Sequence, residues 1–71
     1  MAVTRKLITD RDFTEAEAKQ LLVRVFRDDH MVDAGGVIVR FTPELAVIQS
    51  GVGDVAYYRR DECEFFEMKR R

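Results

Sequence analysis

Hydrophobic residues recur at helical spacing between positions 18 and 26 of the chain. Five of them occupy positions i, i+3, i+4, i+7 and i+8 and so share one face of a helix: Ala18, Leu21, Leu22, Val25 and Phe26. Thr14 and Glu17 precede this face and have the spacing of a capping box. In a capping box, a hydroxyl and a carboxylate accept hydrogen bonds from the free amides at the start of a helix. The pattern predicts a helix from about Glu15 to Asp29. On this placement, Leu22→Asp would bury an unpaired carboxylate and unfold the protein.

The second half of the chain is rich in β-branched and aromatic residues, which favour strands. Residues 37–41 alternate in the pattern of a strand with one buried face. Residues 45–50 and 55–59 have a similar composition, and residues 51–54 supply a hairpin loop between them. Residues 63–68 are predicted to add a last strand. The side chains expected to meet the helix from the sheet include Val37, Val39, Phe41 and Val47.

Two segments of this half also fit helices. Thr42, Pro43 and Glu44 make a good helix opening and a glycine follows at position 51, so residues 43–50 have a helical alternative. Residues 55–68 likewise contain side chains at helical spacing. The β interpretation is preferred for both segments because of their Val, Ile, Tyr and Phe content.

Together these elements predict an α+β fold, with one amphipathic helix packed on a small, mainly antiparallel sheet. The expected order is approximately β-α-β-β-β with a possible last strand, in a single domain of residues 1–71. The first strand falls within residues 3–9, where Arg5 and Lys6 would discourage pairing with another chain at the sheet edge.

Composition narrows the classes of function. Twelve Lys and Arg against thirteen Asp and Glu leave the chain near neutral, which argues against a polybasic nucleic-acid binder. Cys63 is the only cysteine, so a disulfide within the chain is excluded, and one Cys with one His cannot complete a structural zinc site without carboxylates. No apolar run approaches the ~20 residues of a membrane span, and the polar N-terminus is unlike a signal peptide. A cytoplasmic location without membrane association is the expectation, with the lone thiol kept reduced.

The small size of the chain bears on its stability. A domain of this length buries only about 60% of the surface that its unfolded chain exposes. Without a disulfide or a metal, stability must come from a tightly packed core or from self-association. A homodimer is the hypothesis that follows.

Residues of metal-ligand and catalytic types are present but poorly spaced. Asp28, Asp29, His30 and Asp33 could offer oxygen and imidazole ligands at a helix end, but their spacing matches no closed ligand set. They are interpreted as a solvated polar end, and no metal or cofactor is predicted. Cys63 and His30 form the only Cys-His pair, and Cys63 is expected in the core. A domain of this size leaves little room for a substrate pocket, and the glycines lack a phosphate-loop pattern, so no enzyme is predicted.

Aromatic and arginine residues gather in the last third of the chain, and both Tyr and Arg are enriched in protein-interface hot spots. One helix cannot cover all of these side chains, so part of this surface is expected to be buried by a partner. The function predicted from this is a non-enzymatic protein–protein interaction module. It would be a small accessory, regulatory or inhibitory protein of a larger complex, of the kind short chains often are in bacteria and phages. The predicted partner-binding residues are Tyr57, Tyr58, Arg59, Arg60 and Phe66.

Nucleic-acid binding is the alternative. Basic side chains would contact phosphates while neighbouring aromatics stack on bases, and the candidates are Arg59, Arg60, Lys69, Arg70 and Arg71. Four carboxylates interleave with these residues and would repel a phosphate backbone: Asp61, Glu62, Glu64 and Glu67. Protein binding is therefore the preferred hypothesis.

Overall fold

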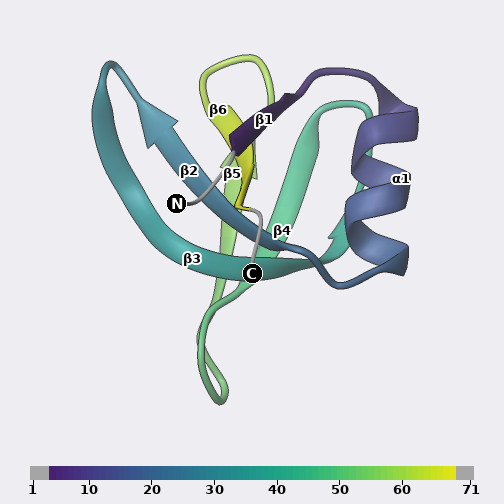
Figure 1. The fold of residues 1–71 in the computed structure, drawn as a ribbon. Coiled ribbons are helices and arrows are strands. Elements are labelled where there is room, and N and C mark those ends of the chain that lie inside the picture. The colour runs from purple at the N-terminus through teal and green to yellow at the C-terminus, as the bar shows by residue number, and fades with distance from the viewer. Residues whose placement is uncertain (1–3, 69–71) are drawn as a thin grey trace.

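One helix packs against a strongly bent antiparallel sheet in the computed structural model, which describes residues 4–68 (Figure 1). The elements in chain order are β1 (Thr4–Leu7), α1 (Asp10–Ala18), β2 (Leu22–Arg27), β3 (His30–Phe41), β4 (Leu45–Gln49), β5 (Val55–Arg59) and β6 (Glu64–Met68). The strands are arranged in the order β1-β6-β2-β3-β4-β5, and neighbouring strands are antiparallel. The predicted α+β fold, one helix on a mainly antiparallel sheet, is therefore confirmed. The order along the chain contains one strand that was not predicted, β2.

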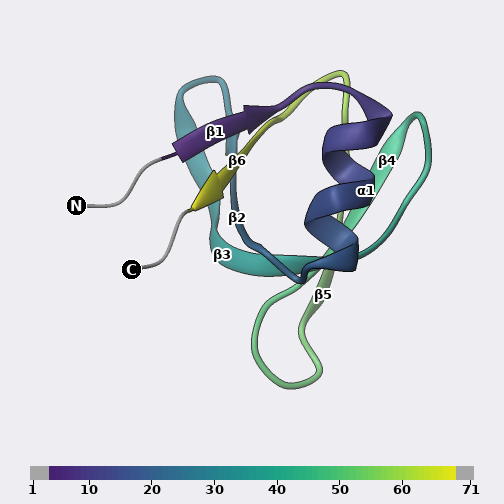
Figure 2. The same cartoon turned by 45° about the vertical axis from the view of Figure 1, so that its right-hand side comes forward.

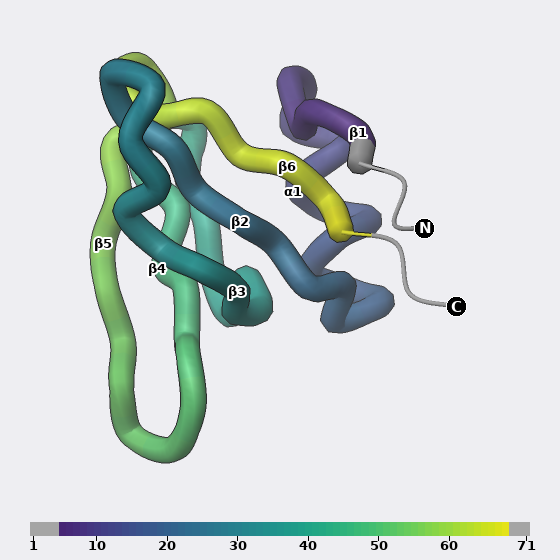
Figure 3. The backbone as a smooth tube through the Cα atoms, turned by 60° about the vertical axis from the view of Figure 1, so that its left-hand side comes forward, coloured from purple at the N-terminus to yellow at the C-terminus, as the bar shows by residue number. Residues whose placement is uncertain are grey.

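The sheet bends along β3, its longest strand. The first part of β3 pairs with β2, and its second part pairs with β4. Register shifts interrupt both pairings, and such bulges bend a strand and increase its twist. As a result, β4 and β5 turn away from the plane of β1, β6 and β2 and enclose the core together with α1 (Figures 2 and 3).

Gly36 allows β3 to approach β4 closely. A Cβ atom at this position would lie 2.7 Å from the Gln49 carbonyl oxygen and 2.7 Å from Ile48 Cγ2, so a side chain would require the strands to separate. A Cβ atom at Gly35 would make only ordinary contacts with Leu22, at 3.4 Å or more. Of the two neighbouring glycines, packing therefore requires only Gly36.

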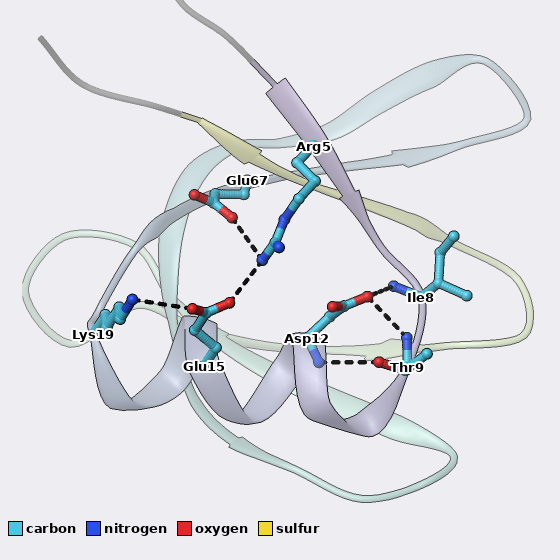
Figure 4. Close-up of polar contacts among 7 residues, drawn as sticks. All are labelled: Arg5, Ile8, Thr9, Asp12, Glu15, Lys19 and Glu67. Atoms are coloured by element: carbon cyan, nitrogen blue, oxygen red, sulfur yellow. Dashed lines mark hydrogen bonds and ion pairs between the residues drawn. The ribbon is translucent and has the colours of Figure 1, made fainter.

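The helix begins and ends earlier than predicted. Its N-cap is Thr9, whose hydroxyl accepts a hydrogen bond from the Asp12 amide at 3.2 Å, while the Asp12 carboxylate accepts from the Thr9 amide at 3.1 Å (Figure 4). This reciprocal capping box replaces the predicted box of Thr14 and Glu17. The helix ends at Ala18, and Gln20 follows with a φ of 51°, which does not continue a right-handed helix. The prediction of a helix from Glu15 to Asp29 was wrong.

Residues 22–27 form β2, and buried and exposed side chains alternate along most of the strand. Val23 and Val25 are fully buried, whereas Arg24 between them is exposed, and β-branched residues favour a strand over a helix. The apolar residues of this segment fit both the helical and the strand period. Leu22 is 36% exposed on β2, so the full burial on a helix face from which unfolding of Leu22→Asp was predicted is absent.

The core is built around aromatic rings contributed by the helix and the sheet. Phe13 of α1 lies with its ring centroid 5.2 Å from Phe65 and 5.7 Å from Phe41. The other buried members are Leu7, Ala16, Val23, Val25, Ile38, Ala46, Ile48 and Cys63. The predicted core position of Cys63 is confirmed, whereas the helix residues that reach the core are Phe13 and Ala16 in place of the predicted face.

A bulge explains which residues of β3 and β4 face the core. Ile38 and Phe41 both contact the core although they stand three residues apart, an odd spacing that a regular strand would direct to opposite faces. The register shift between Ile38 and Arg40 restores Phe41 to the core side. Val39 is consequently 41% exposed, so its predicted core contact was wrong, whereas Val47 is buried, at 8% exposure, outside the cluster around Phe13.

The remaining strand predictions hold. Residues 45–49, 55–59 and 64–68 are strands, so neither helical alternative is adopted. β1 lies at one edge of the sheet, as expected for residues 3–9. Across residues 4–68, no helix has both the length and the hydropathy needed to cross a membrane.

Candidate functional site

The side of the sheet that faces away from the core presents apolar side chains from β3, β4 and β5. In β5, Val55, Tyr57 and Arg59 alternate with inward-facing residues and are exposed. Tyr57 is opposite Val47 in β4, which in turn is opposite Arg40 in β3. The outer face is defined here as Val39, Arg40, Leu45, Val47, Gln49, Val55, Tyr57 and Arg59.

The outer face is exposed at its most apolar points. Tyr57 is 70% exposed, Val55 is 50% exposed and Val39 is 41% exposed. Val47 lies between them and is only 8% exposed, although it does not belong to the core cluster. Val47 thus has the exposed Tyr57 as its neighbour on one side and the exposed Arg40 on the other, so the face combines apolar, aromatic and arginine side chains. Aromatic residues and arginine are enriched in protein interaction surfaces.

β5 also forms a free edge of the sheet (Figure 3). The Arg60 amide donates to the Glu44 carbonyl and the Ser50 amide donates to the Asp54 carbonyl, so the even-numbered residues of this hairpin bond to β4. In an antiparallel pair the residues between them direct their backbone groups to the other side. The N–H and C=O groups of Val55 and Tyr57 therefore point away from β4, along the free edge, whereas the Arg59 carbonyl accepts hydrogen bonds from the Glu62 and Cys63 amides at 3.2 and 3.1 Å.

The opposite edge of the sheet carries charged side chains. Arg5 of β1 donates to Glu15 at 3.0 Å, and its Nη2 atom also lies 3.0 Å from the buried Glu67 Oε1 as an ion pair without hydrogen-bond geometry (Figure 4). Lys6 pairs with Glu64 at 3.2 Å. Hydrogen bonds from Lys19 and then Arg5 lower the pKa of the Glu15 carboxyl. This edge carries two basic residues, Arg5 and Lys6, whereas β5 carries one, Arg59.

Tyr58 faces the inside of the bent sheet, where it connects β5 to β3. Its hydroxyl lies 3.1 Å from Asp33 Oδ2 and 3.4 Å from the Val32 carbonyl. The same carboxylate accepts hydrogen bonds from the Ser50 hydroxyl at 3.1 Å and from the Gly35 amide at 3.1 Å. Desolvation, and then the hydrogen bond with Asp33, raise the pKa of Tyr58. Tyr58 thus makes internal contacts and is only partly accessible to a partner.

The raised pKa of Tyr58 predicts a loss of stability at alkaline pH. The folded protein holds the Tyr58 proton more tightly than the unfolded chain, so this contribution is complete below the ordinary tyrosine pKa of about 10 and is lost as the pH rises through the folded-state value. Thermal unfolding measured between pH 8 and pH 11 should show this loss in the wild type and a smaller one in Tyr58→Phe. Tyr57→Phe is the matched control and should keep the wild-type pH dependence. An identical pH dependence in Tyr58→Phe and the wild type would contradict this assignment.

Arg60 is an internal residue even though it is charged. Its side chain is 11% exposed, and its guanidinium carbon lies 4.1 Å from the ring centroid of Phe13 and 5.7 Å from that of Phe41. The same group donates to the Thr42 carbonyl at 2.6 Å and pairs with Asp10 at 2.8 Å. These contacts join α1 to the β3–β4 turn and leave little of Arg60 free for a partner.

Arg59 lies on the surface but is already paired. Its Nε and Nη2 atoms contact the two carboxylate oxygens of Asp61 at 3.1 and 2.8 Å, and this hydrogen bonding raises the pKa of Arg59 and lowers that of Asp61. Phe66 is half-buried on β6, where its ring packs edge-to-face against Phe26. Of the five predicted partner-binding residues, the structure brings only Tyr57 and Arg59 together on the outer face. Lys69, Arg70 and Arg71 lie outside the described residues.

The residues of metal-ligand type do not converge. Asp28 and Asp29 form the tight β2–β3 turn with φ values of 52° and 66°, and the His30 ring contacts the Asp28 carbonyl at 3.0 Å. Asp33 points instead toward Ser50 and Tyr58. Within the part of the chain that the structure describes, no group of three or more His, Cys, Asp or Glu side chains is placed to hold a metal ion.

An open groove lies at one end of the bent sheet, and it is larger than the small pocket expected for a chain of this size. It has a volume of about 710 Å³ and lies between the β1–α1, β2–β3 and β5–β6 connections. Carboxylates line much of it: Asp28, Asp29, Asp61, Glu62 and Glu64. Cys63 also lines it, but burial raises the pKa of this thiol and so disfavours the nucleophilic thiolate.

Sequence reasoning missed most of the outer face. The alternation of residues 37–41 predicts Val39 in the core, and the bulge in β3 that turns it outward has no clear mark in the sequence. The alternation of residues 55–59 was the available signal, since it already places Val55, Tyr57 and Arg59 on one face. Comparison of the chain with protein-family models, with curated proteins and with solved structures finds no match.

Proposed function

We propose that this protein is a non-enzymatic protein-binding module that contacts its partner through the outer face. The observation that carries the proposal is the exposure of Tyr57, 70%, on a surface that also exposes Val39 and Val55 around the buried Val47. A partner that covered this surface would remove these side chains from water, which is the dominant favourable contribution to most protein association. The protein would then act as a small accessory, regulator or inhibitor of a larger complex.

The rigidity of the sheet favours this role. The outer face is carried on three hydrogen-bonded strands, and Val47 is held between its neighbours. Little ordering is therefore needed on binding, which reduces the entropic cost of association. Tyrosine adds a large contact area with few rotatable bonds, and truncating such a residue at the centre of an interface commonly costs 2 kcal/mol or more of binding free energy, as an order of magnitude.

The proposal is tested by capture of a partner with tagged protein from its native cell lysate. We expect a discrete protein to survive nuclease treatment and moderate salt, and to be lost with Tyr57→Ala and with Val39→Asp. Met31→Ala is the matched control, because Met31 is a 51% exposed apolar residue of β3 outside the outer face. All three variants should melt cooperatively, which separates lost binding from lost folding.

Two results would contradict the proposal. The first is a partner that binds Tyr57→Ala and Val39→Asp as tightly as the wild type. The second is recovery of nucleic acid, with proteins lost on nuclease digestion, which would favour the nucleic-acid alternative. In that case affinity should fall steeply as the salt concentration rises. The pairing of Arg59 with Asp61 is the reason that the protein partner is preferred.

A further inference from the structure

The free edge of β5 carries backbone groups that make no hydrogen bond within the described part of the chain. The amides and carbonyls of Val55 and Tyr57 point away from β4, and so does the Arg59 amide. The Arg59 carbonyl is excluded, because it accepts the Glu62 and Cys63 amides. Two complete pairs of donor and acceptor and one further donor therefore remain, and they recur about every 7 Å along the strand.

The same two residues also expose their side chains. Val55 is 50% exposed and Tyr57 is 70% exposed on the outer face, whereas Ala56 and Tyr58 are half-buried on the inner side. β5 lies at the margin of the sheet, next to β4 alone (Figure 3). The edge and the outer face are therefore continuous, so a molecule that covers the Tyr57 side chain can also reach the N–H and C=O groups of Tyr57.

We propose that the protein partner supplies an extended segment that adds to the sheet beside β5 in the antiparallel direction. This inference rests on the proposed function and states how the partner of the outer face is held. An extended polypeptide has donors and acceptors that alternate at the repeat of the β5 edge, and addition of a strand is a recurring mode of peptide recognition. The antiparallel direction continues the pairing of the existing strands and is the more stable one per residue.

The side chains of the added segment follow from this pairing. Residues directly opposite in an antiparallel pair lie on the same side of the sheet. The segment residues that face Val55 and Tyr57 therefore extend the outer face, and apolar side chains fit there. Backbone hydrogen bonds do not distinguish one sequence from another, so these side-chain contacts supply the selectivity.

The two ends of β5 limit the length of the pairing. Before Val55 the chain belongs to the hairpin loop, which is closed by the hydrogen bond from the Ser50 amide to the Asp54 carbonyl. After Tyr57 only the Arg59 amide is free. The added strand therefore pairs with about three residues of β5, and the outer face must contribute the rest of the contact.

A synthetic peptide tests the edge without the partner. The probe is an acetylated and amidated peptide of alternating valine and threonine with a lysine at each end, added at millimolar concentration to protein labelled with nitrogen-15. We expect the largest chemical-shift changes at the amides of Val55, Tyr57 and Arg59, with slower exchange of their hydrogens. The matched control is the same peptide N-methylated at its valines. It cannot donate to the edge and should bind at least about tenfold more weakly.

Val55→Pro applies the same test to the protein. Val55 begins β5 and its amide points away from β4, so proline removes one edge donor and no hydrogen bond to β4. This variant should bind the peptide about tenfold more weakly than the wild type. Val55→Ala shortens the side chain but keeps the donor, so it should bind more tightly than Val55→Pro. Unchanged amide shifts along β4 would show that the proline variant is folded.

Three results would overturn the proposal. The first is the absence of any change at the three edge amides with millimolar peptide. The second is equal binding of the N-methylated and the unmodified peptide by the wild type, which requires no variant to fold. The third is a shift of the same amides when the protein alone is concentrated, which would make a second copy of the chain the occupant.

The partner captured with tagged protein separates this proposal from the proposed function. Val39 lies on β3, two strands from the β5 edge, so Val39→Asp should lose the partner but still bind the peptide. A partner lost with Val39→Asp and retained by Val55→Pro would overturn the strand addition and leave the proposed function standing. A partner lost with Val55→Pro and retained by Val39→Asp would support the strand addition and contradict the role of the outer face.

Discussion

Phe13→Ala is expected to lower the free energy of unfolding by about 3–5 kcal/mol, the usual cost of removing a buried aromatic ring. Phe13 is 2% exposed, and its ring contacts Phe41, Phe65 and the guanidinium of Arg60. No single neighbour can fill the space that the ring leaves. A chain of this length has a total stability of about 4–10 kcal/mol, so the variant should be close to unfolded at physiological temperature. Urea denaturation followed by circular dichroism measures the change.

Phe26→Ala is the matched control for Phe13→Ala. The same atoms are deleted, but Phe26 is only partly buried, lies outside the core cluster and packs against Phe66. Its loss should cost about 1 kcal/mol, the centre of the range for single substitutions. If the two variants were equally stable, α1 would not occupy the position in the core described above.

Arg60→Ala is expected to cost about 2–3 kcal/mol, which is large for a charged residue. The substitution removes the stacking on Phe13 and the hydrogen bond to the Thr42 carbonyl, and it leaves the ring of Phe13 partly uncovered. Arg60→Lys should recover only part of this loss, because an ammonium group cannot lie flat on the ring while it donates to the same partners. Chemical denaturation of the wild type, Arg60→Lys and Arg60→Ala should give free energies of unfolding that decrease in that order.

Arg59→Ala tests the contrast between the two neighbouring arginines. Arg59 pairs with Asp61 on the surface, and exposed ion pairs contribute little to stability. Its melting temperature should match that of the wild type. A loss in Arg59→Ala as large as that in Arg60→Ala would show that both charges stabilise the fold through a shared network, against the separate roles assigned to them.

The sequence predicts an element correctly where its hydrophobic residues fit either the helical or the strand period, but not both. Residues 55–59 alternate, and β5 is where they predict it. Residues 21–26 satisfy helical and strand spacing together, and only the tertiary structure decides between them, through the burial of Val23 and Val25. The helix start was missed for a related reason: Thr9 with Asp12 and Thr14 with Glu17 are both separated by three residues, and local spacing alone does not rank them.

The candidate site was only partly predictable. The exposure of Tyr57 follows from alternation, but the inward position of Arg60 depends on the turn that brings it over Phe13, a residue 47 positions earlier in the chain. A bulge moves Val39 outward, and neither its existence nor its place is encoded in a local pattern of residue types. For side chains such as Arg60 and Val39, which the sequence could place in the core or on the surface, only the structure gives the position.

The position of β6 has a consequence for how the protein folds during synthesis. β6 follows the other strands along the chain, yet it lies between β1 and β2 in the sheet. Until residues 64–68 have left the ribosome, β1 and β2 cannot be joined and the core lacks Phe65. Partners so distant in sequence raise the contact order, which slows folding. The nascent chain should therefore stay unfolded until its last strand emerges, and then complete its sheet in a single late step.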